Sequence, residues 1–350
     1  MPLYGLNAMG QLNTRAEFTD DGHQPIPLNS FVERIEQSSA KAAGIGFNLS
    51  QAIRLLSRFK RYDVIFATAD ASAVPVLALK SLGLIKTPVV FQSIGLMEFM
   101  RFRKETRIFR IYRRWVNSAD KVICFSWDER DAFADLFGIS IKRIRLLLPC
   151  IDLDYFYPAN AVDGNLILSV GRDAFRDYAT LIRSVDGLIS PVRIIASPGN
   201  LAGLRIPGNV SLMYDIPIAE LREWYRQCRF VVVPERDNIY SAGHSVFLQA
   251  MAMQRACIIS ATAAISRGYD FLRSGENCIL VKPGDFRELR SAIEWLAGNL
   301  QQADQIGKAA RRVVERYFTV DQYAKSLAET FFEVISNQAS DEVRTKRHIA

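Results

Sequence analysis

The sequence predicts an α/β protein with two doubly wound domains, each a parallel sheet covered by helices on both faces, and a cleft between the domains. Three observations predict this class. The chain has 350 residues, 49% of them hydrophobic, which suits two cores at roughly 150 residues per domain. Short apolar runs alternate with helical patterns from about residue 60 to 285. The runs are apolar on both faces, as parallel strands are when helices cover both sides of the sheet.

Ten runs are predicted strands, because each is short, rich in β-branched residues and bounded by turn residues. They are Asp63–Thr68, Pro88–Gln92, Lys121–Ser126, Ile144–Leu148, Leu166–Val170, Arg193–Ala196, Val210–Tyr214, Phe230–Val233, Cys257–Ser260 and Cys278–Val281. Helices of roughly 10–15 residues fit between them, which favours a doubly wound sheet in each half of the chain.

Domain boundaries follow from composition. The stretch Pro149–Gly164 has turn residues and no clear period, so we interpret it as an interdomain linker. We expect an N-terminal domain over 1–155, a second domain over 156–318, a helix over 319–337 that crosses back to the first domain, and a frayed tail over 338–350. A helix is predicted near Tyr4–Gln11, but no apolar strand precedes residue 60, so the opening strand of the first domain is missing or atypical.

Composition excludes several classes of protein. Five cysteines without a CxxC pair are not a disulfide framework and indicate a reducing compartment. Three histidines argue against a His-based zinc site. The start of the chain lacks the basic and apolar segments of a signal peptide, and the longest uncharged run, Asn238–Gln254, is too polar to span a bilayer. We therefore expect a cytoplasmic protein.

Positive charge is concentrated in one segment. The net charge is +7, and Arg101–Arg114 alone holds seven basic residues and one acid. Because the rest of the chain is nearly neutral, this basicity does not indicate a nucleic-acid partner. Apolar residues spaced by three or four predict one amphipathic helix over 99–116 with a cationic face. Such a helix suits a peripheral contact with anionic lipid on the inner face of a membrane, or acidic glycan phosphates; the alternative is a solvated helix face.

Two arginines follow the predicted strand Leu166–Val170. Gly171 ends the strand, and Arg172 and Arg176 lie four positions apart before a helix. Ligands of open α/β sheets bind beyond the carboxyl ends of the strands, and guanidinium groups bind phosphate oxygens through charge-assisted hydrogen bonds. The pattern suits a pyrophosphate group; the alternative is a pair of solvated loop arginines.

A second anion site is predicted in the loop Ser241–Ser245, which follows an apolar strand. Gly243 allows close approach of the backbone, and Ser245 is the expected N-cap of a helix over Val246–Met253. Free backbone N–H groups and the helix dipole favour an anion at this helix start. Gln249 lies one turn into the helix, near the ligand side. An ordinary capped helix is the alternative.

Taken in order, these motifs resemble the retaining glycosyltransferases of the group 1, or family 4, class, whose GT-B fold has two Rossmann-like domains. The resemblance runs from about Ala119 to Leu327. It is carried by SADKVICFS (118–126), LLPCIDLDYFYP (147–158), SVGR (169–172) and SGENCILVKPGD (274–285).

The resemblance implies transfer of a sugar from a UDP- or GDP-sugar to a glycan or lipid-linked acceptor, with retained anomeric configuration, as in polysaccharide biosynthesis, and with no cofactor or metal. In the family, a basic pair holds the donor diphosphate, and Arg172 and Arg176 match it as catalytic residues. Two glutamates eight positions apart mark the donor loop, and the second accepts from the nucleotide ribose. Ser241 and Gln249 stand at these positions, so the acid motif is degenerate, and we expect the amide oxygen of Gln249 to accept from the ribose instead. The other implied donor-site residues are Gly171, Gly243, His244 and Ser245.

The acceptor side is implied in the first domain. Ser93 and Gly95 follow a predicted strand at the family's cleft position, although the histidine of many relatives is absent, and Asp70 follows another strand. For Ser93 and Asp70 the alternative is a structural role in turns. Asp152-Leu-Asp154 has a metal-binding spacing, but it lies at the family's linker position, so we expect no metal there.

Two other functions remain open. A nucleotide-sugar epimerase would keep the fold, but that chemistry requires several acids and a histidine in the cleft, and acids are missing here. A non-catalytic sugar-nucleotide or glycan-binding partner of an active transferase agrees with Ser241 and Gln249. Release of UDP or GDP from a panel of donors separates the transferase from this partner.

Overall fold

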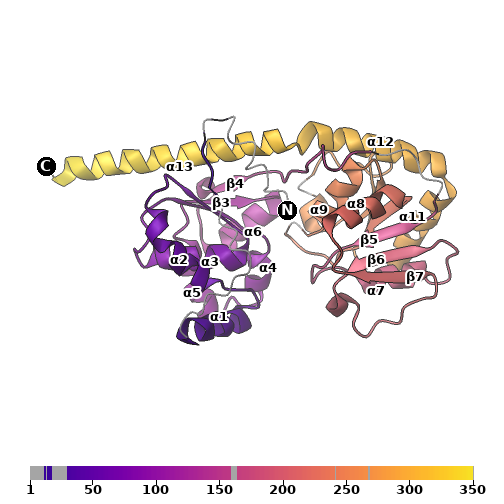
Figure 1. The fold of residues 1–350 in the computed structure, drawn as a ribbon, viewed down its shortest axis with the longest axis horizontal. Helices are drawn as coiled ribbons and strands as arrows, with labels where there is room; N and C mark the ends of the chain where they lie inside the picture. The colour runs from indigo at the N-terminus through magenta and orange to yellow at the C-terminus, as the bar shows by residue number, and fades with distance from the viewer. Residues whose placement is uncertain are drawn as a thin grey trace. The chain divides into compact units, whose positions relative to one another are not determined.

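The computed structural model describes residues 12, 14–17, 30–158, 164–240, 242–266 and 269–349. These form two compact units: the first holds the described residues before Leu148 and from Ala324 on, and the second holds Leu148–Tyr323. Each unit contains one parallel sheet packed between helices (Figure 1). The predicted class, two α/β domains with parallel sheets, is confirmed. The helix predicted near residues 4–11 lies outside the described residues.

The first unit has a four-stranded parallel sheet in the order β1-β2-β3-β4. Its strands are Ile65–Thr68 (β1), Val89–Gln92 (β2), Lys121–Cys124 (β3) and Ile144–Leu146 (β4). Its helices are Ser30–Ala43 (α1), Leu49–Phe59 (α2), Asp70–Ser81 (α3), Leu96–Arg101 (α4), Arg107–Val116 (α5) and Trp127–Phe137 (α6), with a 3₁₀ turn at Ile141–Arg143. All four strands fall where the sequence predicts them.

The second unit has a six-stranded parallel sheet in the order β10-β9-β8-β5-β6-β7. Its strands are Ile167–Val170 (β5), Val192–Ala196 (β6), Val210–Tyr214 (β7), Phe230–Val233 (β8), Ala256–Ser260 (β9) and Ile279–Val281 (β10). Its helices are Tyr178–Val185 (α7), Ile218–Gln227 (α8), His244–Ala252 (α9), Ala263–Ser266 (α10), Phe286–Gly298 (α11) and Leu300–Tyr317 (α12), with a 3₁₀ turn at Pro198–Leu201.

Alternate residues of the second sheet enter two separate cores, because successive side chains of a strand point to opposite faces. Leu168 and Val231 pack with α9 on one face. Ile167 and Val232 pack with α7 and α11 on the other. Burial on both faces explains why these strands read as continuous apolar runs in the sequence.

The basic segment is two helices, so the single amphipathic helix predicted over 99–116 is wrong. α4 ends because the guanidinium of Arg103 donates to the carbonyl of Phe99, at 2.7 Å. Thr106 then caps α5, since its hydroxyl accepts from the amide of Phe109 at 3.2 Å. Both contacts satisfy backbone groups that a continuous helix would pair internally. Phe109 and Tyr112 of α5 are buried, as the periodicity predicts.

The last helix, Val320–Ile349 (α13), begins in the second unit and belongs to the first from Ala324 on. From α13, the ring of Phe331 lies 5.7 Å from the ring of Phe66, and Glu333 forms an ion pair with Lys121. The helix continues to Ile349, whereas we expected residues after 337 to fray; no glycine or proline interrupts this stretch. No helix among the described residues combines the length and apolar content needed to cross a membrane.

The described part of the predicted linker makes specific hydrogen bonds. The amide of Ile151 donates to the carbonyl of Phe318 at 2.9 Å, so the two segments that connect the units pair with each other. The carboxylate of Asp152 accepts from the amides of Asp154 and Tyr155 at 3.1 and 2.9 Å. The Asp-X-Asp spacing therefore forms a turn. All five cysteines are free.

Candidate functional site

The order of the second sheet reverses between β5 and β8. β6 and β7 extend the sheet from β5, while β9 and β10 extend it from β8. Open α/β sheets bind ligands at the carboxyl ends of strands beside such a reversal. The segments that leave β5 and β8 here are residues 171–177 and 234–243, so the candidate site is built from them.

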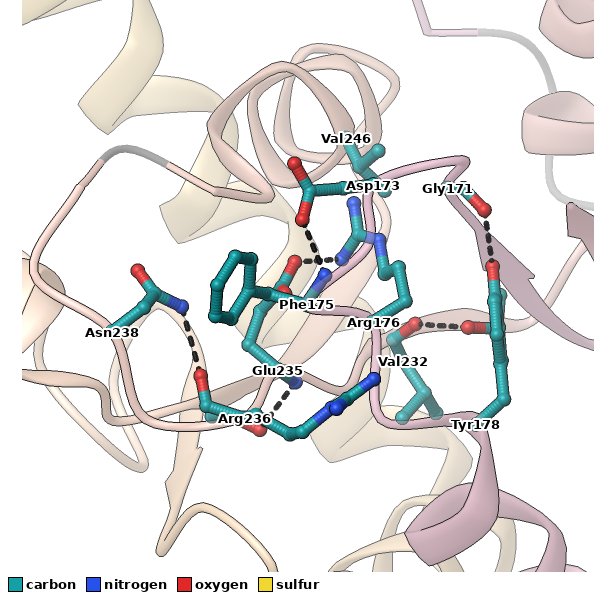
Figure 2. Close-up of polar contacts among 12 residues, drawn as sticks. Gly171, Asp173, Phe175, Arg176, Tyr178, Val232, Glu235, Arg236, Asn238 and Val246 are labelled. Atoms are coloured by element: carbon teal, nitrogen blue, oxygen red, sulfur yellow. Dashed lines mark hydrogen bonds and ion pairs between the residues drawn. The ribbon is translucent and has the colours of Figure 1, made fainter. Parts of the chain in front are cut away.

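A buried ion pair joins these two segments (Figure 2). Nη1 of Arg176 lies 2.5 Å from Oε1 of Glu235, and the two side chains are 2% and 3% exposed. The backbones pair as well: the amide of Asp177 donates to Pro234 at 3.0 Å, and that of Arg236 donates to Phe175 at 2.9 Å. Burial raises the pKa of Glu235 to about 7, although Arg176 opposes that rise. The pair therefore holds a cation and a weakly acidic carboxyl at the sheet reversal.

Two glycines make room for the pair. A Cβ on Gly171 would lie 1.8 Å from Nε of Arg176. A Cβ on Gly243 would lie 2.8 Å from Oε1 of Glu235 and 3.2 Å from Nη1 of Arg176. Both glycines were predicted donor-site residues, and the structure shows that they border Arg176. Gly243 also takes a left-handed conformation, with φ of 76°, which favours glycine.

Helix α9 begins directly after this glycine. Gly243 is its N-cap residue and His244 its first residue, so the predicted N-cap role of Ser245 is wrong: the left-handed turn at Gly243 starts the helix earlier. Ser245 is exposed in the first turn. The amide of Val246 already donates to the carbonyl of Gly243 at 3.0 Å, whereas the two amides before it have no carbonyl one turn earlier in their own helix, so this tip remains suited to an anion. Ser241 lies outside the described residues.

The side chain of His244 faces the core. Its Nδ1 lies 2.9 Å from the hydroxyl of Tyr269, and its ring packs edge-on against Phe247 and Tyr269. Burial lowers the pKa of His244 to about 3, so the imidazole is neutral. What His244 can offer a ligand at the α9 tip is its backbone amide.

Gln249 is held by a buried tyrosine. The hydroxyl of Tyr225 donates to Oε1 of Gln249 at 3.0 Å, and Tyr225 is fully buried. We expected this amide oxygen to accept from a nucleotide ribose. Since Tyr225 already occupies one of its two lone pairs, the amide nitrogen becomes an equally available group, and it donates.

The two predicted arginines diverge. Arg172 is exposed, and its guanidinium pairs with Asp215 at 3.0 Å, beyond the end of β7. Arg176 turns the other way, toward the end of β8. The structure thus places Arg176 beside the α9 tip and does not place Arg172 there. Their roles at a donor diphosphate stay predictions.

The three predicted acceptor-side residues do lie together, at the carboxyl ends of β1 and β2. The carboxylate of Asp70 accepts from the hydroxyl of Ser93 and the amide of Ile94, both at 3.3 Å, and from the amide of Leu96 at 2.9 Å. Gly95 is the residue before α4. Burial raises the pKa of Asp70 to about 6, although these hydrogen bonds oppose that rise. The contacts give Asp70 and Ser93 a structural role in this loop; an acceptor role stays a prediction.

Sequence reasoning missed Glu235, Asp215 and Tyr225. The sequence did hold a signal for Glu235. This acid follows the apolar run Phe230–Val233 after a single residue, Pro234, so it lies at the carboxyl end of a predicted buried strand. Asp215 likewise follows a strand directly. Tyr225 gave no signal, since a tyrosine on an amphipathic helix is ordinarily core.

Two sequence models of glycosyltransferase families match the chain. The one described as "Glycosyltransferase Family 4" matches residues 18–155, and "Glycosyl transferases group 1" matches residues 167–299. With these two matches and two parallel-sheet units, the chain belongs to the group 1 glycosyltransferases of the GT-B fold.

Curated relatives carry the same kind of name. The chain is 23% identical over 269 residues to D-inositol 3-phosphate glycosyltransferase 1 of Catenulispora acidiphila, covering 64% of this chain and 61% of the relative. It is 22% identical over 233 residues to a D-inositol 3-phosphate glycosyltransferase of Thermomonospora curvata, covering 55% and 52%. The chain thus spans less than two thirds of the length of these relatives.

Solved structures share the fold. HepE of Anabaena, in complex with UDP-glucose, superposes with a TM-score of 0.68 at 14% identity, over 81% of this chain and 82% of HepE. Sucrose-phosphate synthase of Thermosynechococcus elongatus superposes with a TM-score of 0.66 at 18% identity, over 83% and 79%.

Proposed function

We propose that the protein transfers a sugar from a nucleoside-diphosphate sugar to a glycan or lipid-linked acceptor in the cytoplasm, with retained anomeric configuration. The observation that carries the proposal is the α9 tip: it lies at the sheet reversal beside Arg176, in a chain of the glycosyltransferase family. The complex of HepE with UDP-glucose supports a nucleotide sugar as the donor.

The charge of the leaving group is the chemical problem that this site addresses. As the bond between the anomeric carbon and the diphosphate oxygen breaks, negative charge grows on the diphosphate. The N–H groups of the α9 tip, with Arg176 held beside them, supply positive charge fixed before the reaction. The exposed guanidinium of Arg172 adds to it by leaving Asp215 for the diphosphate. The acceptor oxygen bonds to the anomeric carbon on the face that the diphosphate leaves, and the departing phosphate takes the acceptor proton. We propose that no metal is required for this step.

The test is release of nucleoside diphosphate from a panel of UDP- and GDP-sugars. UDP-glucose is the first donor, and D-inositol 3-phosphate joins the acceptors because the curated relatives are named for it. We expect one donor to give UDP or GDP at equal rates with Mg²⁺ and with EDTA, and proton NMR of the product to show the donor's anomeric configuration. Inversion, a rate lost in EDTA, or no release from any donor contradicts the proposal.

A second function is favoured by the uncharged residue at the position of the second family glutamate. Gln249 brings no negative charge to the donor loop and its oxygen is engaged by Tyr225. A chain that binds a nucleotide sugar or glycan without turnover, as the partner of an active transferase, fits this feature. Calorimetric binding of a donor without nucleotide release, with every acceptor tried, identifies this function.

We further propose that α5 contacts anionic lipid at the inner face of a membrane. Arg107, Arg110, Ile111 and Arg114 are all exposed, and their spacing of three and four residues puts them on one face of the helix. Phe102, which is 71% exposed, lies just before α5. A cationic helix face with exposed apolar side chains binds anionic membrane surfaces, where a lipid-linked acceptor would be found.

A further inference from the structure

The Arg176–Glu235 pair is enclosed on all the sides that the structure describes. Gly171 and Gly243 border it, the hydroxyl of Ser260 accepts from the amide of Glu235 at 2.9 Å, and both side chains are at most 3% exposed. In this position the guanidinium has a fixed location beside Gly243, the N-cap residue of α9. The carboxylate of Glu235 also borders Gly243, since a Cβ there would lie 2.8 Å from Oε1 of Glu235 and 3.2 Å from Nη1 of Arg176.

The charges around Glu235 leave Arg176 as its main counter-ion. Asp173 and Asp177, on the segment after β5, raise its pKa, and Arg236 on its own segment lowers it by less than Arg176 does. Asp173 accepts from Tyr240, Asp177 caps α7 through Thr180, and Arg236 donates to the Ala174 carbonyl at 2.9 Å.

From α9, the imidazole of His244 is neutral and contacts Tyr269. Among the described residues, Oε2 of Glu235 is buried and has no hydrogen-bond partner. An ionised carboxylate with one bare oxygen is costly in such a place, so this group has a strong tendency to hold a proton.

We propose that Glu235 is a positioning residue that fixes Arg176 beside the α9 tip and takes up a proton when an anion binds there. The inference rests on the proposed function, in which that anion is the donor diphosphate. With Glu235 ionised, the buried pair is neutral, so Arg176 attracts an anion weakly. With Glu235 protonated, the same guanidinium is an uncompensated cation next to the helix tip, where low dielectric strengthens its attraction for the diphosphate.

The affinity of this site for a diphosphate should depend on pH. An incoming diphosphate raises the pKa of Glu235 further, so binding is accompanied by proton uptake, and affinity falls as the pH rises through about 7. For one linked proton we expect the Kd to rise about fivefold from pH 7 to pH 8. UDP-glucose suits this measurement because its diphosphate carries no group that titrates in this range.

The experiment is calorimetry of UDP-glucose binding to the full chain at pH 6, 7 and 8, in two buffers of different ionisation enthalpy. We expect uptake of about one proton at pH 8 by the wild type and none by Glu235→Gln, which binds about tenfold tighter than the wild type at that pH. Glu276→Gln is the matched control, since Glu276 is exposed and pairs with Arg273; it should retain the wild-type pH profile. Equal profiles for the wild type and Glu235→Gln overturn the proposal.

Glu235→Gln leaves Arg176 buried without a counter-charge, which endangers folding. The variant Arg176→Gln/Glu235→Gln removes both charges, and we expect it to bind UDP-glucose more weakly, with a flat pH profile. If the wild type binds no UDP-glucose, the proposed donor fails, but Glu235 is still tested by unfolding. Because its folded pKa lies above its unfolded value of about 4.5, the stability of the wild type relative to the double variant must fall as the pH rises from about 4.5 to 7. A constant difference overturns the proposal.

Discussion

The guanidinium of Arg172 pairs with Asp215 at 3.0 Å, and in doing so it reaches across β6 from the end of β5 to the end of β7. Arg176, four residues later, turns toward β8 on the opposite side. The two arginines that follow one strand therefore serve two separate regions of the sheet edge. Because Arg172 and Asp215 are 67% and 66% exposed, their contact adds little to stability, and Arg172 is free to exchange this partner for a ligand.

This relationship predicts opposite effects of two substitutions. Asp215→Asn removes the competing carboxylate, so UDP-glucose should bind about twofold to threefold tighter, whereas Arg172→Ala should weaken binding about tenfold. Neither should change the free energy of unfolding by more than about 0.5 kcal/mol. Arg273→Ala is the control, since Arg273 is equally exposed and pairs with Glu276. Tighter binding by Arg172→Ala, or equal effects of Arg172→Ala and Arg273→Ala, would contradict the assignment.

Glycine is required at 243 for two reasons that a pair of variants separates. Gly243 and Gly187 share a φ of 76°, but a Cβ on Gly187 meets nothing within 4 Å. Gly187→Ala should thus cost only the left-handed conformation, about 1 kcal/mol. Gly243→Ala adds contacts of 2.8 Å with Glu235 and 2.9 Å with Val233, so we expect a loss of about 2–4 kcal/mol. Urea denaturation measures the free energy of unfolding of both variants. Equal losses of stability would show that the Arg176–Glu235 pair is not tightly enclosed at Gly243.

The fold was predictable because burial on both faces of the sheet requires a run of consecutive apolar residues in each strand, and each run can be recognised on its own. β8, with four consecutive buried residues, reads as an apolar run that no surface strand or amphipathic helix produces. The start of α9 was misplaced by two residues, since Ser245 satisfies the usual N-cap preference and only the backbone geometry at Gly243 shows that the helix begins earlier.

Partners of the site residues were not predictable in the same way. Whether Arg176 meets Glu235 depends on β5 lying beside β8, and that adjacency is decided by the whole sheet. The break between α4 and α5 was missed for a related reason: apolar residues keep helical spacing through it, while the hydrogen bond of Arg103 to Phe99 that ends α4 depends on side-chain position.

Asp70 should make the stability of the first unit dependent on pH. Burial raises its pKa from 3.8 to about 6 in the fold, so between these values the folded state holds a proton that the unfolded state has lost. Stability from this group is therefore greatest below about pH 4 and falls as the pH rises to 6. Relative to Asp70→Asn, the wild type should lose about 2–3 kcal/mol over this interval.

Urea denaturation at pH 4, 5, 6 and 7 measures this difference, in which the other carboxylates cancel. Ser93→Ala is the matched control, because it removes one hydrogen bond of 3.3 Å to Asp70 and leaves the carboxyl buried. It should lower stability by about 1 kcal/mol or less. Because this hydrogen bond opposes the rise in the pKa of Asp70, the variant should keep a fall of stability with pH at least as large as that of the wild type. A difference between wild type and Asp70→Asn that does not vary with pH would show that Asp70 titrates normally.

Charge reversal on α5 tests the proposed membrane contact. Arg107→Glu/Arg114→Glu changes two exposed positions on the helix face that also carries Ile111, which is 44% exposed. Each basic residue near an anionic surface contributes about 1 kcal/mol, so reversing two should lower the partition constant on vesicles containing phosphatidylserine by at least about thirtyfold. The control is Arg312→Glu/Arg316→Glu, which makes the same change of charge on exposed positions of α12 in the other unit. If both double variants lose binding equally, net charge alone explains the attraction, whereas a loss confined to the α5 variant assigns the contact to this helix.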